Sequence, residues 1–127
     1  MQDKHLYEYA IIRVLPKVER EEFINVGLIM FCKRKKFIQF KYEIPQDKIR
    51  AFCKDFDLEQ LELHLKGFEL TANGGKNGGP IGAFEIAERF RWLTAIKSSC
   101  IQTSRPHPGL TENLEQTFND LYQELVS

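Results

Sequence analysis

Hydrophobic positions dominate the start of the chain with only isolated charged residues among them, a pattern that predicts β-strands there. Residues 6–15 are rich in aromatic and β-branched side chains. Pro16 follows them and cannot donate a ladder hydrogen bond, so these residues predict the first strand. With the period of two of a strand, Arg13 shares one face with Tyr9 and Ile11. We therefore expect a charged guanidinium among apolar neighbours.

Further strands are predicted after the first one. Residues 26–32 are apolar without alternation, which is typical of a strand covered on both faces and predicts the centre of the sheet. Residues 37–42 are close enough in sequence to pair with them as an antiparallel hairpin, which completes a meander. Residues 99–104 are short and β-prone and end before Pro106, so they predict a fourth strand. The strand order 1-2-3-4 and an order with the fourth strand beside the first both remain open.

The 3.6-residue period of amphipathic helices predicts two helices in the middle of the chain. A short one is expected after Pro45, where Ile49 and Phe52 begin an apolar stripe. Asp57 is positioned to cap the next helix, with Gln60 as its reciprocal capping partner. The apolar face of this second helix is expected to contain Leu58, Leu61, Leu65 and Phe68.

Two more helices are predicted toward the end of the chain. Residues 83–95 suit a helix, although residues 90–93 also suit a strand. Residues 114–125 repeat apolar side chains at helical spacing after the candidate caps Thr111 and Asn113. We expect this terminal helix to pack on the sheet.

A glycine-rich segment separates the middle helices from the last ones. Five of the eight residues in 73–80 are Gly or Pro, which predicts a mobile loop over about 73–82 that acts as a linker or lid. The segment lacks the Lys-Ser ending of a phosphate-binding P-loop, and Lys76 is not followed by a helix at the required spacing.

These elements predict an α+β fold in a single domain, residues 1–127. An antiparallel sheet of three to four strands, beginning as a β-meander, is expected to pack against three to four helices. A chain of 127 residues is the usual size of one domain. The three cysteines are odd in number and form no C-x-x-C motif, so free thiols are expected.

Composition and charge limit the cellular location and the kinds of partner that are expected. No apolar run approaches the length of a membrane span, and the first residues lack the apolar segment of a signal peptide, so a cytoplasmic location is expected. The net charge is zero, but residues 1–54 carry +5 and residues 55–127 carry −5. This asymmetry predicts a basic and an acidic side. No pattern predicts a cofactor, a metal site or an oligomeric state.

A charged turn between the first two strands is the densest candidate site. Its members share polar side chains near one end of the predicted sheet: Arg13, Glu19, Arg20, Glu22 and Asn25. In a purely structural interpretation, Glu19 or Glu22 pairs with Arg13, and Asn25 lies in a turn or bulge. In a functional interpretation, Arg13 and Arg20 bind a carboxylate or phosphate. Convergence of Arg89, Arg91 and His107 on the same end would favour the second interpretation.

A second group of polar side chains lies around the fourth strand, and comprises Ser98, Ser99, Gln102, Ser104 and His107. Hydroxyls close to an imidazole are the components of nucleophilic catalysis, which also needs a group that orients the base. No G-x-S-x-G motif supports that chemistry. Structural hydrogen bonding is the simpler interpretation. His107 is expected in a stiff loop between Pro106 and Pro108.

The hairpin between the second and third strands is strongly basic. Its cations are Lys33, Arg34, Lys35, Lys36 and Lys41, with Phe37, Phe40 and Tyr42 close by. Cations beside aromatic rings can bind phosphates and stack on bases, which would suit a nucleic-acid-binding module. Four cations at a hairpin tip also form a solvated turn that blocks edge pairing, and the aromatic side chains alternate toward a core.

Three stretches in order carry a family resemblance. Residues 9–32 place an apolar strand before Glu19-Arg20-Glu21-Glu22-Phe23-Ile24-Asn25-Val26-Gly27 and a second apolar strand. Residues 78–82 read Gly-Gly-Pro-Ile-Gly and precede Glu88-Arg89-Phe90-Arg91-Trp92-Leu93-Thr94. Ser98-Ser99, residues 101–104, His107 and Gly109 complete the pattern. Together they resemble the bacterial domain-of-unknown-function family 3037.

The resemblance implies a partner and no reaction. Members of this family are often encoded beside HipA-like kinase proteins, which implies a HipA-like kinase as partner and a regulatory role. We therefore expect a non-enzymatic protein-interaction domain. The alternatives are a nucleic-acid-binding module that uses the hairpin 33–41, and a small hydrolase or transferase that acts on an anionic substrate.

Overall fold

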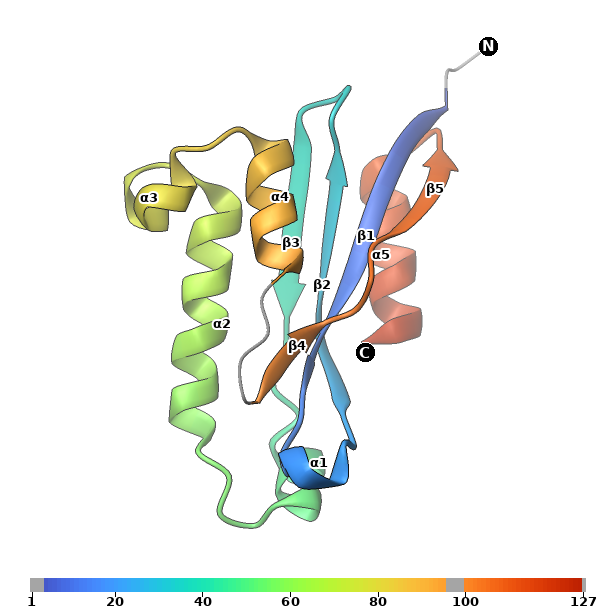
Figure 1. Cartoon of the computed structure of the whole chain (residues 1–127). Helices are drawn as coiled ribbons and strands as arrows, with labels where there is room; N and C mark the ends of the chain where they lie inside the picture. Colours follow the sequence, from blue (N-terminus) through green and yellow to red (C-terminus); the bar gives the residue numbers. More distant parts are fainter. Residues whose placement is uncertain (1–3, 96–99, 127) are drawn as a thin grey trace.

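The computed structural model describes residues 4–95 and 100–126, in which a five-stranded antiparallel sheet is covered by helices (Figure 1). The fold is α+β, as predicted. The strands are β1 (His5–Val14), β2 (Ile24–Cys32), β3 (Phe37–Tyr42), β4 (Ile101–Thr103) and β5 (His107–Thr111). The helices are α1 (Gln46–Phe52), α2 (Leu58–Asn73), α3 (Gly79–Gly82), α4 (Ile86–Thr94) and α5 (Leu114–Leu125), with short 3-10 turns at Val18–Arg20 and Lys76–Gly78.

The sheet has the strand order β3-β2-β1-β4, and β5 also pairs with β1. The predicted meander of β1, β2 and β3 is confirmed. The fourth strand lies beside the first, because β4 pairs with the C-terminal end of β1 while β5 pairs with its N-terminal half. β1 and β2 are therefore the inner strands of the sheet.

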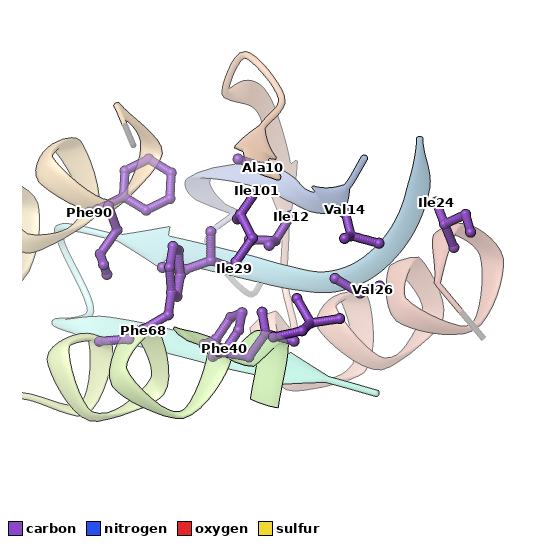
Figure 2. Close-up of a cluster of buried hydrophobic side chains, with 14 of the residues drawn as sticks. Ala10, Ile12, Val14, Ile24, Val26, Ile29, Phe40, Phe68, Phe90 and Ile101 are labelled. Atoms are coloured by element: carbon purple, nitrogen blue, oxygen red, sulfur yellow. The ribbon is translucent and has the colours of Figure 1, made fainter. Parts of the chain in front are cut away.

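Helices cover both faces of the sheet (Figure 1). One core cluster joins the sheet to α1, α2 and α4, and Figure 2 shows Phe40, Phe68 and Phe90 within it. The other cluster joins the opposite face to α5 through Phe118 and Tyr122. All residues of β2 except Asn25 are buried, which confirms the prediction of a strand covered on both faces.

Helix caps follow the sequence closely. The Asp57 side chain accepts a hydrogen bond from the backbone N–H of Gln60 at 3.0 Å, so the predicted cap of α2 is confirmed. The Gln60 side chain contacts His64 and so does not complete the capping box. Asn113 caps α5 by accepting from the Gln116 N–H at 3.0 Å.

The helix predicted within residues 83–95 is confirmed as α4, so the alternative of a strand at residues 90–93 is excluded. Two other predictions about local structure are wrong. His107 lies in β5 and not in a stiff loop, because β1 provides an open edge for residues 107–111. Residues 76–82 form a 3-10 turn and the short helix α3, held by hydrogen bonds such as that from the Gly75 N–H to the Gly82 carbonyl at 3.0 Å. The mobility of this segment stays a prediction.

Candidate functional site

Arg13 lies on the α5 side of the sheet, near the end of β1. Its backbone neighbours across the sheet are Asn25 on β2 and Gln102 on β4. The guanidinium carbon lies 4.4 Å from the centre of the Phe23 ring, and the Nε atom is buried with no hydrogen-bond partner in the described residues. The guanidinium therefore has an apolar contact in Phe23, whereas its neighbours across the sheet are polar, so the predicted apolar surroundings are confirmed only in part.

The charged turn before β2 contains an ion pair between two of its own residues. Glu22 pairs with Arg20, and both side chains are largely exposed. Among residues 4–95 and 100–126, no ion pair joins Arg13 to Glu19 or Glu22, so that predicted pairing is wrong. Glu22 pairs with a cation that is close to it in sequence. Its carboxylate therefore stays near solvent and avoids the cost of being desolvated beside Arg13 on the sheet.

Asn25 lies next to a β-bulge in which Val26 is the extra residue, so the bulge predicted here is confirmed. The register of β1 and β2 shifts here, with Ile12 opposite Gly27 and Arg13 opposite Asn25. The Asn25 Nδ2 atom donates a 3.0 Å hydrogen bond to the carbonyl of Leu125. Asn25 therefore ties the bulge to the C-terminal end of α5, which is a structural role.

Arg89 and Arg91 do not converge on Arg13. Arg89 Nη1 donates to the Ala72 carbonyl at 3.0 Å and so satisfies the last turn of α2. Arg91 forms a two-pronged ion pair with Glu8 on β1, at 3.0 and 2.9 Å. These hydrogen bonds raise the pKa of Arg91. Both guanidinium groups link elements of the fold.

The hydroxyl and imidazole group is also dispersed. Ser98 and Ser99 lie outside the described residues. Ser104 is buried and its Oγ accepts from the Ile11 N–H at 2.8 Å, so this hydroxyl is engaged with the backbone. Gln102 lies opposite Arg13, whereas the exposed His107 ring lies 5.3 Å from the Tyr9 ring. Over the part of the chain that the structure describes, no group of three His, Cys, Asp or Glu residues could hold a metal ion.

The cations at the tip of the basic hairpin are exposed to solvent, whereas its aromatic side chains pack against the core. Residues 33–36 are exposed at the tip between β2 and β3. Lys41 is separate from them, because its Nζ atom lies 4.6 Å from the centre of the Tyr122 ring on α5. Phe37, Phe40 and Tyr42 pack against the two core clusters. These aromatic side chains therefore belong to the core, and nucleic-acid binding stays a prediction.

An apolar hollow of about 410 Å³ lies between α2, α4 and β4. Its lining residues are Leu63, His64, Gly67, Phe68, Thr71, Trp92, Leu93 and Ile101. Phe68, Leu93 and Ile101 belong to the buried core. Leu63 is 66% exposed and Trp92 is 48% exposed, so large apolar side chains border the hollow without being covered.

Two further hollows adjoin this central one. Trp92 is shared with a hollow of about 430 Å³ on α4, which Phe84, Ala87, Glu88 and Arg91 also line. Leu63 is shared with a hollow of about 540 Å³ beside α2, which Ile44, Gln46, Leu58, Glu59 and Glu62 also line. We call these three hollows and their lining residues the α2–α4 surface.

Sequence reasoning missed the α2–α4 surface, although a signal was present. The apolar stripe of α2 contains Leu61 and Leu65, and Leu63 lies off that stripe. Trp92 likewise lies beside the buried residues Phe90 and Leu93 of α4. Large apolar residues outside a helix's buried stripe indicate a second contact surface.

Comparison with known proteins gives one match. The family model described as "Protein of unknown function (DUF3037)" matches residues 9–126, which is nearly the whole chain. No curated protein and no solved structure matches the chain significantly.

Proposed function

This chain belongs to the DUF3037 family of unknown function, and we propose that it is a cytoplasmic, non-enzymatic protein-binding domain. The α2–α4 surface is its contact surface. The HipA-like kinase implied by the family resemblance is the first partner to test, in a regulatory role. A binding role is supported because three of the candidate polar groups are engaged in structural contacts: the Ser104 hydroxyl with backbone, and Arg89 and Arg91 with α2 and Glu8.

The observation that carries this proposal is the clustering of exposed apolar side chains. Six large hydrophobic residues are exposed in the described part of the chain. Three of them, Leu63, Phe84 and Trp92, line the α2–α4 surface. Contiguous exposed apolar groups mark interaction sites in single domains, and Trp and Arg are enriched among the residues that dominate binding energy.

The surface is also preformed. The floor of the central hollow consists of Phe68, Leu93 and Ile101, which are 7%, 0% and 5% exposed. Side chains held by a packed core keep one arrangement, so a partner meets walls that need little reorganisation. Arg91 lines the α4 hollow and is fixed by its fork to Glu8, which gives that end a positioned polar group.

The test compares surface variants in partner capture. The tagged full chain is purified from its native cells as wild type, Trp92→Ala, Leu63→Ser and the control Leu110→Ser. Leu110 is 62% exposed but lies on β5, outside the α2–α4 surface. We expect wild type and the control to retain one stoichiometric protein. The Trp92 variant should lose at least about tenfold of it, since a dominant contact is worth about 2 kcal/mol or more.

Four results would contradict the proposal. Equal capture by all four proteins would place the contact elsewhere, and loss in an added Arg13→Ala variant would place it at the end of the sheet. Recovery of nucleic acid with wild type, reversed by salt, would favour the hairpin at residues 33–36. Recovery of neither class of molecule would remove the protein-binding role.

A further inference from the structure

We infer that Arg13 and Gln102 form an oxyanion site at the end of the sheet, which binds the carboxylate or phosphate group of a small molecule. Arg13 lies on the face of the sheet that α5 covers, whereas α2 and α4 pack against the other face. The oxyanion site is therefore separate from the α2–α4 surface, and it goes beyond the proposed function.

The guanidinium of Arg13 is a cation without an anion. Its side chain is half-buried and forms no hydrogen bond or ion pair within residues 4–95 and 100–126. Of the three guanidinium nitrogens, only Nε is buried without a partner, so both Nη atoms reach solvent. Arg89, the other half-buried arginine of the described residues, does donate a hydrogen bond, to the Ala72 carbonyl. The Nη donors of Arg13 are thus free for an oxyanion.

The Arg13 side chain is held in place before any ligand binds. The guanidinium carbon lies 4.4 Å from the centre of the Phe23 ring, and Arg13 belongs to β1, which is paired on both sides. The register of β1 and β2 shifts between Ile12 and Arg13, and β-bulges re-aim side chains next to functional sites. A donor group that is already positioned loses little conformational entropy on binding.

Gln102 supplies a second donor beside the guanidinium. It lies directly opposite Arg13 in the β1–β4 ladder, so the two side chains leave the sheet on the same face. The Gln102 side chain is half-buried and makes no hydrogen bond in the part of the chain that the structure describes. The Asn25 amide, on the other side of Arg13, is instead engaged with the Leu125 carbonyl. Free N–H donors therefore come from Arg13 and Gln102.

These donors select an oxyanion. Carboxylate and phosphate groups present two oxygens that match the planar guanidinium, and an amide N–H adds a further hydrogen bond. Glu22 of the charged turn pairs with Arg20, so it leaves Arg13 unneutralised. Arg89 and Arg91 are engaged with other elements, so a single guanidinium carries the site. One cation suits one small anionic group, whereas a nucleic-acid backbone needs several cations in a row.

The experiment follows side-chain N–H signals of the isotope-labelled, full-length protein by NMR. Acetate and inorganic phosphate each replace chloride at constant ionic strength, so that screening stays the same. We expect the Arg13 Nε–H and Gln102 amide signals to shift along a saturable curve, while the Arg20 signal stays in place. Tighter binding of phosphate would identify a phosphate as the preferred group, and tighter binding of acetate would identify a carboxylate.

Variants separate the geometry of the site from its charge. Arg13→Lys keeps the charge but removes the planar pair of donors, and should weaken oxyanion binding roughly tenfold. Gln102→Leu removes the amide donor and should weaken binding roughly threefold or more, the effect of about one hydrogen bond. Arg20→Lys is the matched control outside the site and should leave the affinity unchanged.

The inference and the proposed function fail in different ways. Absence of a saturable shift at Arg13 in the wild type would overturn the inference. Equal affinity in the wild type and Arg13→Lys would also overturn it, because charge alone would then explain the shift. Unchanged affinity in Gln102→Leu would remove Gln102 from the site. Partner capture that ignores Trp92 would overturn the proposed function and leave the oxyanion site as it stands.

Discussion

Ile11 and Ser104 exchange two hydrogen bonds at the point where β4 ends. The Ser104 N–H donates to the Ile11 carbonyl at 2.7 Å, and the Ile11 N–H donates to Ser104 Oγ at 2.8 Å. A side-chain oxygen thus takes the place of a backbone acceptor in the ladder. This arrangement lets one chain segment pair with both ends of β1, first as β4 and then as β5.

Ser104→Ala should destabilise the protein, because it leaves the Ile11 N–H without its acceptor inside the sheet. Ser104 is 7% exposed, so water replaces the lost hydrogen bond poorly. We expect the free energy of unfolding, measured by urea denaturation, to fall by about 1–3 kcal/mol. Hydrogen exchange at the Ile11 amide should accelerate more than exchange at Ile29 in β2. Unchanged exchange at Ile11 would show that another acceptor replaces the hydroxyl.

Gly74→Ala should be strongly destabilising, because two features of this position exclude a side chain. Its φ angle is +77°, and a Cβ atom would collide with Arg89 Nη1. That nitrogen is the donor to the Ala72 carbonyl at the end of α2. We expect a loss of about 2–4 kcal/mol in the free energy of unfolding, from strain and from the displaced guanidinium together.

Gly67→Ala is the matched control for that substitution. Gly67 lies inside α2, and a Cβ atom there would meet nothing within 4 Å. The same chemical change should therefore stabilise the protein by about 0.5–1 kcal/mol through helix propensity. Thermal unfolding of both variants provides the comparison. Destabilisation by both would mean that glycine at 67 has a role of its own in the central hollow.

The sequence predicts the elements whose own residues show which side chains are buried, and it misses elements that depend on contacts with distant residues. β2 was predictable because an unbroken apolar run indicates a strand that is buried on both faces, and α5 was predictable because its helical period shows which face is buried. β5 was missed because Pro106 and Pro108 argue against a strand, yet β5 pairs only with β1, and proline is tolerated at such an edge. The helical turns at residues 76–82 were missed because Gly and Pro favour loops when neighbouring contacts are ignored.

The candidate site depended on contacts between distant residues, which a single sequence does not contain. The polar residues near Arg13 were correctly placed at one end of the sheet, but period and charge do not show that Phe23 lies over the guanidinium. Leu63 and Trp92 were visible as apolar residues outside a buried stripe. Their meeting around one hollow follows from the packing of α2 beside α4.

Alkaline pH should destabilise the protein through two tyrosines whose pKa values are raised in the folded state. Tyr122 is 2% exposed and donates to Glu43 at 2.8 Å, so burial, and then the hydrogen bond and charge of Glu43, raise its pKa. Burial and Glu62 raise the pKa of Tyr42 to about 12. Unfolding returns each pKa to its ordinary value near 10, so the unfolded state releases protons first. The stabilisation that these two tyrosines contribute is therefore fully present below pH 10 and is lost as pH rises above 10.

Tyr122→Phe separates this effect from the titration of lysines. The variant should lose stability at pH 8, because the Glu43 contact is gone, but its further loss between pH 10 and 11.5 should be smaller. The difference in slope should approach about 1.4 kcal/mol per pH unit, the value for one proton. Urea unfolding at each pH measures it, and a spectroscopic titration of the folded protein follows the tyrosines directly. Identical slopes would contradict the assignment to Tyr122.

Arg13→Met should leave stability unchanged or raise it. The buried Nε of Arg13 has no hydrogen-bond partner in the described residues, which costs about 1–3 kcal/mol, and the contact with Phe23 returns about 0.5–1 kcal/mol. Methionine keeps much of the aliphatic stem and has no polar hydrogen. We expect the free energy of unfolding to rise by up to about 1 kcal/mol.

Arg20→Met is the control for Arg13→Met, because Arg20 is 63% exposed in its pair with Glu22 and should change stability by less than about 0.5 kcal/mol. A loss above about 2 kcal/mol in the Arg13 variant alone would show that the guanidinium has an anionic partner in solution. A gain would show that Arg13 is maintained at a cost to stability, as binding residues often are. Partner capture with that stable variant would then decide whether the end of the sheet takes part in recognition.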